Sequence, residues 1–395
     1  MEILKPKLHL SAFALILVFF TSFGALGENK IDKKTKDKPA SGALASKTTL
    51  KVGLVLPLSG SLEASGKDFY RGVEHALAEL KNKVGPKVIL KVKDNQSDPL
   101  LSAQLTKELI LKDRVSVILG PIQEANLLAA AAIAEEFRTP MLSPSLVDLS
   151  QQNLGEYVFV VSASQKRMID SLVHYAVTQL KRPSFGLLVD QSSQQSIMQA
   201  KYFKEAATKL GAKVLLEQQF VTGLADFSPV VQNFVTHKVN TVFVPGAAAD
   251  VSKLTKFAYD VGQRWVFLGS DQWEDKKLFV ENGKAIVGHY FPLPYHHGVA
   301  VVGNQDFVKV FTEAHKSLPG VYAAAGFDLF NVLIEGDNHS KLKGAAIALK
   351  ESIETLKAFP ALLAPLDMDP LRRRQRPVVI METQAVRATV KAIRD

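Results

Sequence analysis

The chain of 395 residues contains no cysteine. This absence excludes disulfide bonds, cysteine nucleophiles and thiolate metal ligands. It also excludes lipid attachment to an N-terminal cysteine, so we expect a protein that is not a lipoprotein. Long apolar runs are scarce too: the one continuous apolar segment, about Leu10 to Phe20, is shorter than the roughly 20 residues that cross a bilayer. We therefore expect no stable membrane insertion.

The N-terminal residues have the pattern of an export signal. Lys5 and Lys7 precede the apolar segment, and Ala25-Leu26-Gly27 supplies the small residues that a signal peptidase reads. We expect residues 1–27 to form a signal peptide that is cleaved near Gly27, and the protein to reside in the periplasm. Residues 28–48 are rich in lysine and are expected to form a flexible linker.

The common catalytic and nucleotide-binding motifs are missing as well. The sequence has no GxxxxGKS/T loop, no GxGxxG after a strand, no GxSxG elbow and no HExxH. His296 and His297 are adjacent, and we expect solvated loop residues there rather than metal ligands. The one acid–base pair that an enzyme could use is Glu124 with Asp271. We therefore expect no enzyme, no cofactor and no metal site.

The net charge of +9 lies at the two ends of the chain, because residues 49–370 are neutral. A neutral body offers no basic face, so we expect no nucleic-acid partner. Arg372-Arg373-Arg374 and Arg376 form the densest basic cluster. We expect a solvated turn there, with anionic lipid, cell-wall polymer or a protein partner as the alternatives.

The body of the chain alternates between strand-like and helix-like patterns. Predicted strands cover 51–56, 87–93, 115–119, 157–162, 184–189, 213–217, 240–244, 265–268 and 285–291. Predicted helices between them cover 66–82, 99–112, 123–137, 166–180, 195–210, 226–237 and 248–261, followed by 303–317, 321–336 and 341–358. A predicted strand at 376–382 and a shorter one at 385–390 end the chain. This alternation predicts an α/β protein with parallel sheets in two lobes.

Small polar loops follow most of the predicted strands, beginning with the stretch Lys51 to Leu80. There a buried strand stops at Pro57 and a loop from Ser59 to Gly66 precedes an amphipathic helix. Similar loops occur at 120–124, 143–145, 190–194, 245–247 and 269–273. Each loop alone is most simply a turn with a helix cap. Together they predict a ligand pocket at the carboxyl ends of the strands.

The order of these pieces resembles a known family. The matching segments are VGLVLPLSG and FYRGVEHAL, VKDNQSDPLLSAQLTKELI, VSVILGP, TPMLSPS, EYVFVV, ADFSPVVQNF and NTVFVPG. The sequence is similar to type I periplasmic binding proteins of the branched-chain amino-acid (Leu/Ile/Val) family over roughly residues 49–340. The resemblance implies a solute-binding protein that captures an amino-acid-like or polar ligand, with an ABC permease as partner.

The resemblance implies two intertwined, doubly wound parallel-sheet lobes joined by three hinge crossings, near 161–164, 288–292 and 364–367. Lobe one would comprise 49–161 and 292–363, and lobe two 164–288. Residues 364–395 would hold the last crossing and return strands to lobe two. Ligand contacts to both lobes would then favour a closed form.

Ligand-binding positions are also implied by the resemblance. They are Ser59, Ser65, Gln123, Glu124, Ser145, Leu146, Val147, Gln194, Ala247 and Asp271. Asp271 would receive a ligand ammonium group. Glu124 stands where the family has a serine and would repel a ligand carboxylate if both were desolvated. A simple aliphatic amino acid is therefore disfavoured as the ligand.

Two segments, LVLPLSGSLEASG and FLGSDQWEDKKL, are similar to the domain of penicillin-binding protein activators, a second branch of this fold. That resemblance implies an alternative function, a docking module that regulates peptidoglycan synthesis with a penicillin-binding protein as partner. Trp265 and Trp273 are expected in the core or pocket wall of lobe two rather than on a partner surface.

Overall fold

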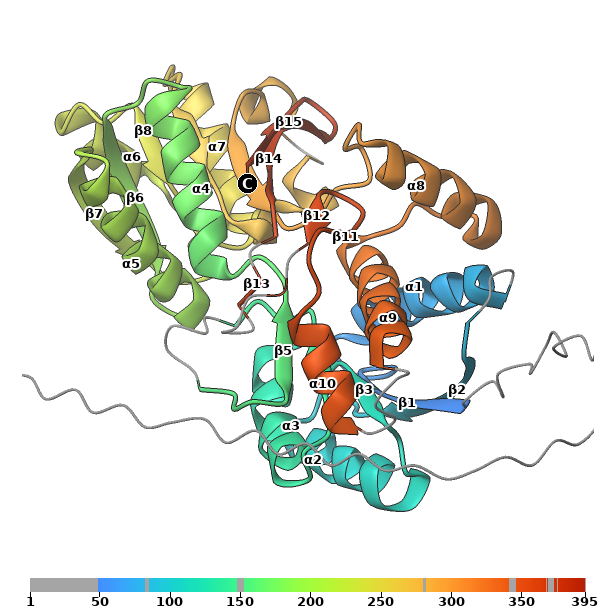
Figure 1. Cartoon of the computed structure of the whole chain (residues 1–395). Helices are drawn as coiled ribbons and strands as arrows, with labels where there is room; N and C mark the ends of the chain where they lie inside the picture. Colours follow the sequence, from blue (N-terminus) through green and yellow to red (C-terminus); the bar gives the residue numbers. More distant parts are fainter. Residues whose placement is uncertain are drawn as a thin grey trace, which may run out of the picture. The chain divides into compact units, whose positions relative to one another are not determined.

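The computed structural model describes residues 49–81, 85–147, 153–279, 282–340, 346–366, 368, 373–374 and 376–394, with side chains omitted at 346–348 and 373–374. The described residues belong to one compact unit that extends from Lys47 to Asp395. Its strands form two large sheets, one with six strands and one with seven, and each sheet has helices on both faces (Figure 1). The predicted α/β fold with doubly wound parallel sheets is confirmed.

The six-stranded sheet is entirely parallel, in the order β13-β5-β4-β3-β1-β2. Its strands are β1 (Thr49–Leu56), β2 (Lys87–Asp94), β3 (Val117–Leu119), β4 (Met141–Ser143), β5 (Val158–Val161) and β13 (Arg373–Arg374). The helices packed on it are α1 (Glu63–Lys81), α2 (Pro99–Glu108) with a π-helical turn at Leu109–Asp113, α3 (Glu124–Glu136), α9 (Val321–Ser340) and α10 (Ala346–Glu354). Helix α8 (Val302–His315) lies before α9.

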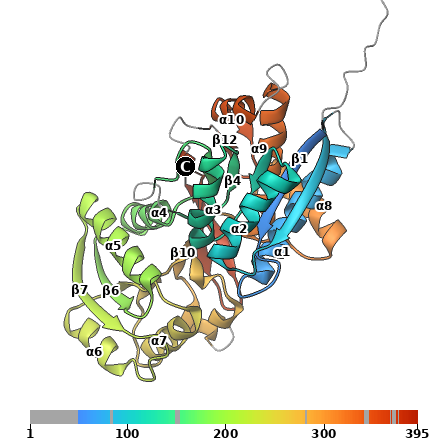
Figure 2. The same cartoon turned by 90° about the horizontal axis from the view of Figure 1, so that it is seen from below.

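The side chains of β1 point alternately to the two faces of the sheet, and different helices cover these faces. Val52 and Leu54 pack with residues of α1 and α9, whereas Val55 packs against α3 on the other face. Helices α1 and α9 approach closely because glycines stand at their contact. A Cβ atom at Gly72 would lie 2.0 Å from the carbonyl oxygen of Ala323, and one at Gly326 would lie 2.2 Å from that of Phe69. Figure 2 shows α2 and α3 together on this sheet.

The seven-stranded sheet has the order β15-β14-β10-β9-β8-β6-β7. Its strands are β6 (Ser184–Asp190), β7 (Lys213–Phe220), β8 (Thr241–Phe243), β9 (Val266–Leu268), β10 (Tyr290–Leu293), β14 (Val378–Thr383) and β15 (Ala388–Arg394). Strands β6 to β10 are parallel, and β14 and β15 are added antiparallel. One face packs on α4 (Gln165–Thr178) and α5 (Gln194–Lys209), the other on α6 (Ser228–Thr236) and α7 (Ala248–Asp260).

Both tryptophans lie in the core beside this sheet, as predicted. Trp265 is 8% exposed and meets Phe234 edge to face with ring centroids 6.0 Å apart. Trp273 is fully buried and lies 6.2 Å from the ring of Phe291. Neither side chain is available as a partner surface.

The passages between the two sheets differ from the prediction at two places. The chain leaves the six-stranded sheet after Val161, and α4 begins at Gln165 against the seven-stranded sheet. The second passage was expected at 288–292, but β10 continues to Leu293 because residues 290–293 pair with β14. The chain therefore leaves this sheet only after Leu293.

The third passage, expected at 364–367, also lies later in the sequence. Pro365–Leu366 is strand β12, which pairs with β11 (Phe359–Pro360) in a separate two-stranded sheet. Arg373 and Arg374 still pair with Val160 and Val161 in the six-stranded sheet. The chain crosses to β14 only between Arg374 and Val378.

The predicted signal peptide at 1–27, the linker at 28–48 and Asp367 lie outside the described residues. Within the part of the chain that the structure describes, no helix combines the length and hydrophobicity needed to cross a membrane.

Candidate functional site

The loop after β1 uses its polar groups to fix its own conformation. Ser59 donates from its backbone N–H and from Oγ to the carboxylate of Asp94, at 3.2 and 2.7 Å. Burial opposes ionisation of Asp94, but the hydrogen bonds from Ser59 and neighbouring backbone groups outweigh it, and the pKa lies below its ordinary value. Ser65 is half-buried on α1. The hydroxyl of Ser59 is thus already engaged within the loop.

Four of the predicted positions stand at the starts of helices. Glu124 is exposed in the first turn of α3, beside the exposed Gln123, and Gln194 is exposed at the start of α5. A carboxylate in the first turn of a helix is stabilised by the helix dipole. Because Glu124 is solvated, the predicted repulsion of a ligand carboxylate does not follow. Ala247 is the N-cap residue of α7 and is half-buried.

The segment after β4 turns its side chains in different directions. Leu146 lines a pocket, and Ser145 beside it is buried with an Oγ atom that has no hydrogen-bond partner within the described residues. Val147 packs instead in the core with Leu127 and Val158. The structure therefore brings Leu146, but not the side chain of Val147, to the pocket.

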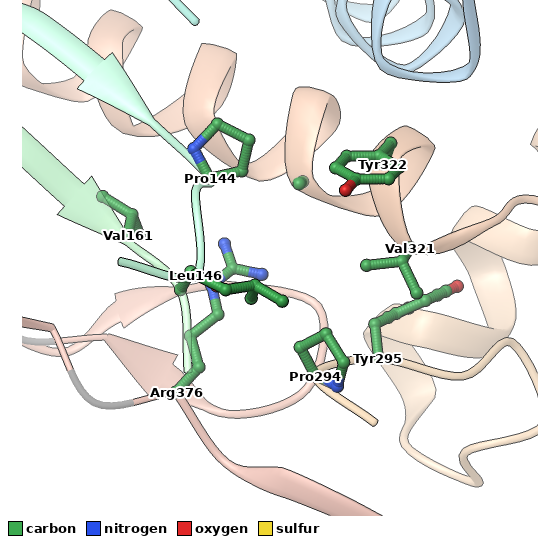
Figure 3. Close-up of a pocket in the computed structure, with 10 residues that line it drawn as sticks. Pro144, Leu146, Val161, Pro294, Tyr295, Val321, Tyr322 and Arg376 are labelled. Carbon is green, nitrogen blue, oxygen red and sulfur yellow. The ribbon is translucent and has the colours of Figure 1, made fainter. Parts of the chain in front are cut away.

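That pocket lies where segments from both sheets meet (Figure 3). Its walls come from the ends of β4, β5 and β10, from the start of α9 and from the passage into β14. The lining residues are Pro144, Leu146, Val161, Ser162, Pro294, Tyr295, Val321, Tyr322, Ala325 and Arg376. The cavity volume is about 30 Å³, which corresponds to roughly two water molecules. Most of the lining is apolar, and Arg376 is its one charged residue.

Arg376 corrects the expectation of a solvated turn. The residue is only 5% exposed, and its Nη1 atom lies 2.9 Å from Oδ2 of Asp328 on α9. Asp328 also accepts a hydrogen bond from the backbone N–H of Leu362 through Oδ1, at 3.2 Å. A charge this deeply buried requires a partner. The pair connects the passage into β14 with a helix that packs on the six-stranded sheet.

Two tyrosines complete the polar part of the pocket. Tyr295 is buried, and its hydroxyl has no hydrogen-bond partner among the described residues. Burial and the negative charges of Asp328 and Asp68 raise the pKa of Tyr295. Burial also raises the pKa of Tyr322, as does the charge of Asp271. The charge of Asp271, in the loop after β9, thus affects Tyr322 in the first turn of α9.

Asp271 stands in the loop after β9, within the 3₁₀ turn Asp271–Trp273. It accepts a hydrogen bond from Nε2 of Gln199 at 3.2 Å. Burial raises the pKa of its carboxyl, and the hydrogen bond from Gln199 only partly offsets this. The buried hydroxyl of the preceding Ser270 has no hydrogen-bond partner within the described ranges. The loop therefore presents an acidic group that a bound cation would stabilise.

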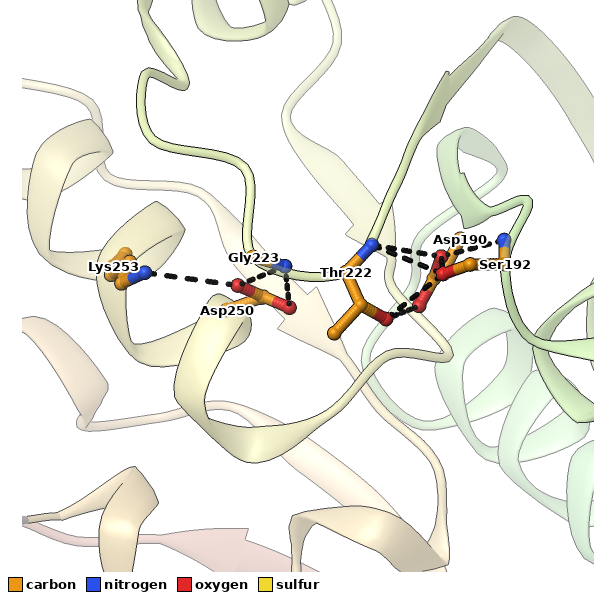
Figure 4. Close-up of polar contacts among 6 residues, drawn as sticks. All are labelled: Asp190, Ser192, Thr222, Gly223, Asp250 and Lys253. Carbon is orange, nitrogen blue, oxygen red and sulfur yellow. Dashed lines mark hydrogen bonds and ion pairs between the residues drawn. The ribbon is translucent and has the colours of Figure 1, made fainter.

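Two other acidic residues at strand ends have structural roles (Figure 4). Asp190, at the end of β6, accepts hydrogen bonds from Ser192 and from both the N–H and hydroxyl of Thr222. Burial disfavours the charged form of Asp190, but these hydrogen bonds prevail and lower the pKa. Asp250 accepts from the N–H of Gly223 at 3.0 Å. These hydrogen bonds fix the conformation of the loop after β7.

His296 and His297 also differ from the prediction, because they are half-buried rather than solvated. Their rings stack with centroids 4.1 Å apart. Burial, with a smaller effect of His297, lowers the pKa of His296 to about 4. Both rings line a hollow of about 720 Å³ beside the β14–β15 hairpin. The described residues hold no group of three or more His, Asp or Glu that could bind a metal ion.

Of the residues in and around this pocket, sequence reasoning nominated Leu146, Ser145 and Asp271 but not Arg376, Tyr295, Tyr322 or Gln199. Tyr322 lies at the start of the predicted helix 321–336, and this position is the one indication of Tyr322 in the sequence. The resulting arrangement combines an apolar pocket, a buried guanidinium and a separate carboxylate, with no nucleophile and base in contact. It is suited to binding a small polar molecule.

Comparisons with known proteins agree with this geometry. The family model described as "Periplasmic binding protein" matches residues 49–388. A Leu/Ile/Val-binding protein homolog of Brucella melitensis is 24% identical over 351 residues, which cover 85% of this chain and 86% of the relative. The matched relatives give no support to the resemblance with penicillin-binding protein activators.

Two solved structures share the fold. The branched-chain amino-acid substrate-binding protein LivJ of Streptococcus pneumoniae, in complex with isoleucine, has a TM-score of 0.71 and 21% identity, with coverage of 87% of this chain and 99% of the other. A solute-binding protein of Rhodopseudomonas palustris, in complex with 3,4-dihydroxybenzoic acid, has a TM-score of 0.72 and 21% identity, covering 88% and 97%. With the family match over most of its length, the chain belongs to the type I periplasmic binding proteins of the branched-chain amino-acid family.

Proposed function

We propose that this protein captures an amino acid or a small aromatic acid between its two sheet-based lobes, in the periplasm, and delivers it to an ABC importer. The observation that carries this proposal is the pocket whose walls come from strand ends of both sheets and from the start of α9. A ligand held there contacts both lobes, so binding would stabilise one arrangement of them. The ligands in two related structures, isoleucine and 3,4-dihydroxybenzoic acid, are an amino acid and a small aromatic acid.

Of the residues expected from sequence, we retain Ser145, Leu146 and Asp271 as ligand contacts and add Tyr295 and Tyr322. Ser145 and Tyr295 carry buried hydroxyls without partners in the described structure. Such groups are destabilising until a ligand or water satisfies them. Residues 1–27 would direct export, as the sequence predicts.

A thermal-shift screen of the purified full chain tests the proposal. The panel comprises L-leucine, L-isoleucine, benzoate, 4-hydroxybenzoate and 3,4-dihydroxybenzoate, after release of any bound ligand by unfolding and refolding. A ligand present at 100 times its Kd stabilises the native state by about 2.7 kcal/mol, so a true ligand raises Tm by several degrees. Absence of a shift with every compound, and with cell-wall fragments, would contradict the proposed function.

Replacement of Asp271 by asparagine should stabilise the unliganded protein and weaken binding of amino-acid probes. Because burial raises the pKa of Asp271, the protonated carboxyl is favoured in the folded state. The stability that the protonated carboxyl contributes is fully present below the unfolded-state pKa of about 4. It is lost as the pH rises through the folded-state pKa. Urea unfolding at pH 3.5 and pH 7 measures the free energy of unfolding on both sides of this change.

The difference in stability between D271N and wild type should appear at pH 7 and be small at pH 3.5. Glu382, which is hydrogen-bonded to Tyr290 at 2.7 Å, is a matched control, because E382Q alters a carboxyl away from this pocket. A D271N variant that is less stable than wild type at pH 7, with unchanged affinity for isoleucine, would show that Asp271 is a structural acid only.

A further inference from the structure

Arg376 has two guanidinium nitrogens, Nε and Nη2, that are buried and have no hydrogen-bond partner within the described residues. The third nitrogen, Nη1, is the one that meets Asp328 at 2.9 Å. Nε and Nη2 lie on the same edge of the guanidinium, where two N–H bonds point in parallel. This edge matches the two oxygens of a carboxylate, which it binds bidentately. The open edge of Arg376 is therefore a preformed carboxylate receptor.

The surroundings of this edge indicate what else the ligand must carry. The side chain of Arg376 is 7% exposed and reaches the pocket at the level of Leu146 and Val161 (Figure 3). Tyr322 and Ala325, both on α9, also line this pocket. The cavity of about 30 Å³ has room for a group of about the size of two water molecules. A carboxylate meets this size, and its apolar body would lie against Leu146 and Tyr322.

We propose that Arg376 binds the carboxylate of a small organic acid through Nε and Nη2, and that the protein thereby selects carboxylates over the corresponding amides and alcohols. The inference rests on the proposed solute-binding function and names the residue that receives the carboxylate of the ligand. The ion pair with Asp328 involves Nη1 and leaves Nε and Nη2 open. Since both free nitrogens are shielded from water, an anion reaches them only when the pocket widens.

The selectivity follows from what each ligand leaves unpaired. A carboxylate supplies two acceptors to the two parallel donors, whereas an amide supplies one acceptor and directs its own donors at the guanidinium. A binding site with buried donors rejects analogues that cannot satisfy them, by factors that reach 10⁴. We expect a preference for formate over formamide, and for benzoate over benzamide, of at least 10-fold.

NMR of the ¹⁵N-arginine-labelled full chain tests the proposal with formate as the probe. The Nε–Hε resonance of Arg376 is assigned by its absence from the R376K variant. Sodium formate is titrated to 0.5 M against sodium chloride at constant ionic strength, with formamide as the neutral isostere. We expect a saturable shift of the Arg376 resonance with formate and at least a 10-fold weaker response to formamide.

The R376K variant supplies the binding control, because lysine keeps a positive charge beside Asp328 but lacks the two-donor edge. The affinity of R376K for formate should be at least 10-fold lower than that of the wild type, while its circular dichroism spectrum stays native. The inference would be overturned if the Arg376 resonance did not shift with formate, or if it shifted equally with formamide.

Failure of this inference is distinguishable from failure of the proposed function. Binding of isoleucine or benzoate without a change at Arg376 would overturn the carboxylate site alone. A formate response at Arg376, with no member of the larger panel bound, would support the anion site and contradict solute capture of those compounds.

Discussion

Replacement of Arg376 by methionine is expected to lower the free energy of unfolding by about 3–5 kcal/mol. The change removes the guanidinium whose Nη1 lies 2.9 Å from Oδ2 of Asp328, a carboxylate that is 2% exposed. Asp328 retains the hydrogen bond from the backbone N–H of Leu362 but loses this buried positive charge. Urea unfolding at pH 7, followed by the fluorescence of the two buried tryptophans, measures the loss.

A double-mutant cycle separates the ion pair from simple packing. If the cost arises from the loss of the positive charge beside Asp328, the double variant R376M/D328N should be more stable than R376M, because the buried carboxylate is removed as well. Arg387 is exposed on the β14–β15 hairpin and gives a matched control, R387M, with a change within about 0.5 kcal/mol. A loss of less than about 1 kcal/mol for R376M would show that the pair does not secure the passage into β14.

Arg376 also shows what could not be predicted from the sequence. Arg376 was expected to be solvated together with the rest of its basic cluster. Asp328 lies 48 positions earlier on an apolar helix, and only the folded chain brings the two together. The passage into β14 was misplaced for a related reason. Strand β13 has two residues, Arg373 and Arg374, which is too short to show any periodicity.

Elements with a complete local pattern were predicted well. Strand β1 and helix α1 were recognised from the apolar run that stops at Pro57 and from the spacing of Phe69, Val73 and Ala76, which are all buried. Longer strands and amphipathic helices carry their own burial pattern in the sequence. Which loop residues turn toward a pocket depends on the opposite lobe. This is why Leu146 and Val147, adjacent in sequence, end in the pocket and in the core.

Helix starts posed a separate problem for predicting the site. Glu124 and Gln194 follow strands directly, as ligand-binding residues of this fold do, yet both are exposed. At such positions a polar residue serves the helix terminus as well as it would serve a ligand. Burial without a partner, as found for Ser145 Oγ and Arg376 Nε, separates these two roles and cannot be read from sequence.

Replacement of Trp273 by alanine is expected to lower the free energy of unfolding by about 3–5 kcal/mol and to weaken the binding of any amino-acid probe that uses Asp271. Trp273 is fully buried against Phe291, and its Nε1 atom has no hydrogen-bond partner in the described structure. The loss is therefore one of packing alone. Gly269 allows the ring to lie directly on the loop, since a Cβ there would approach Cδ2 of Trp273 to 2.1 Å.

The position of the ring explains why stability and binding should change together. Trp273 closes the 3₁₀ turn that begins at Asp271, and it anchors this turn to the core beside the seven-stranded sheet. Without the indole, the turn loses its fixed position, and the carboxylate and its hydrogen bond to Gln199 become less ordered. Calorimetric titration with isoleucine at a temperature where the variant is folded should show lower affinity.

Trp265 provides a control of the same size in the same core. It directly precedes β9, whereas the Asp271 turn follows that strand, and it packs against Phe234 and Phe267. The W265A variant should lose a comparable amount of stability but keep its affinity for isoleucine, whereas W273A should lose both. Equal affinities in the two variants would mean that the turn holds Asp271 in place without the indole, and that Gln199 alone orients the carboxylate.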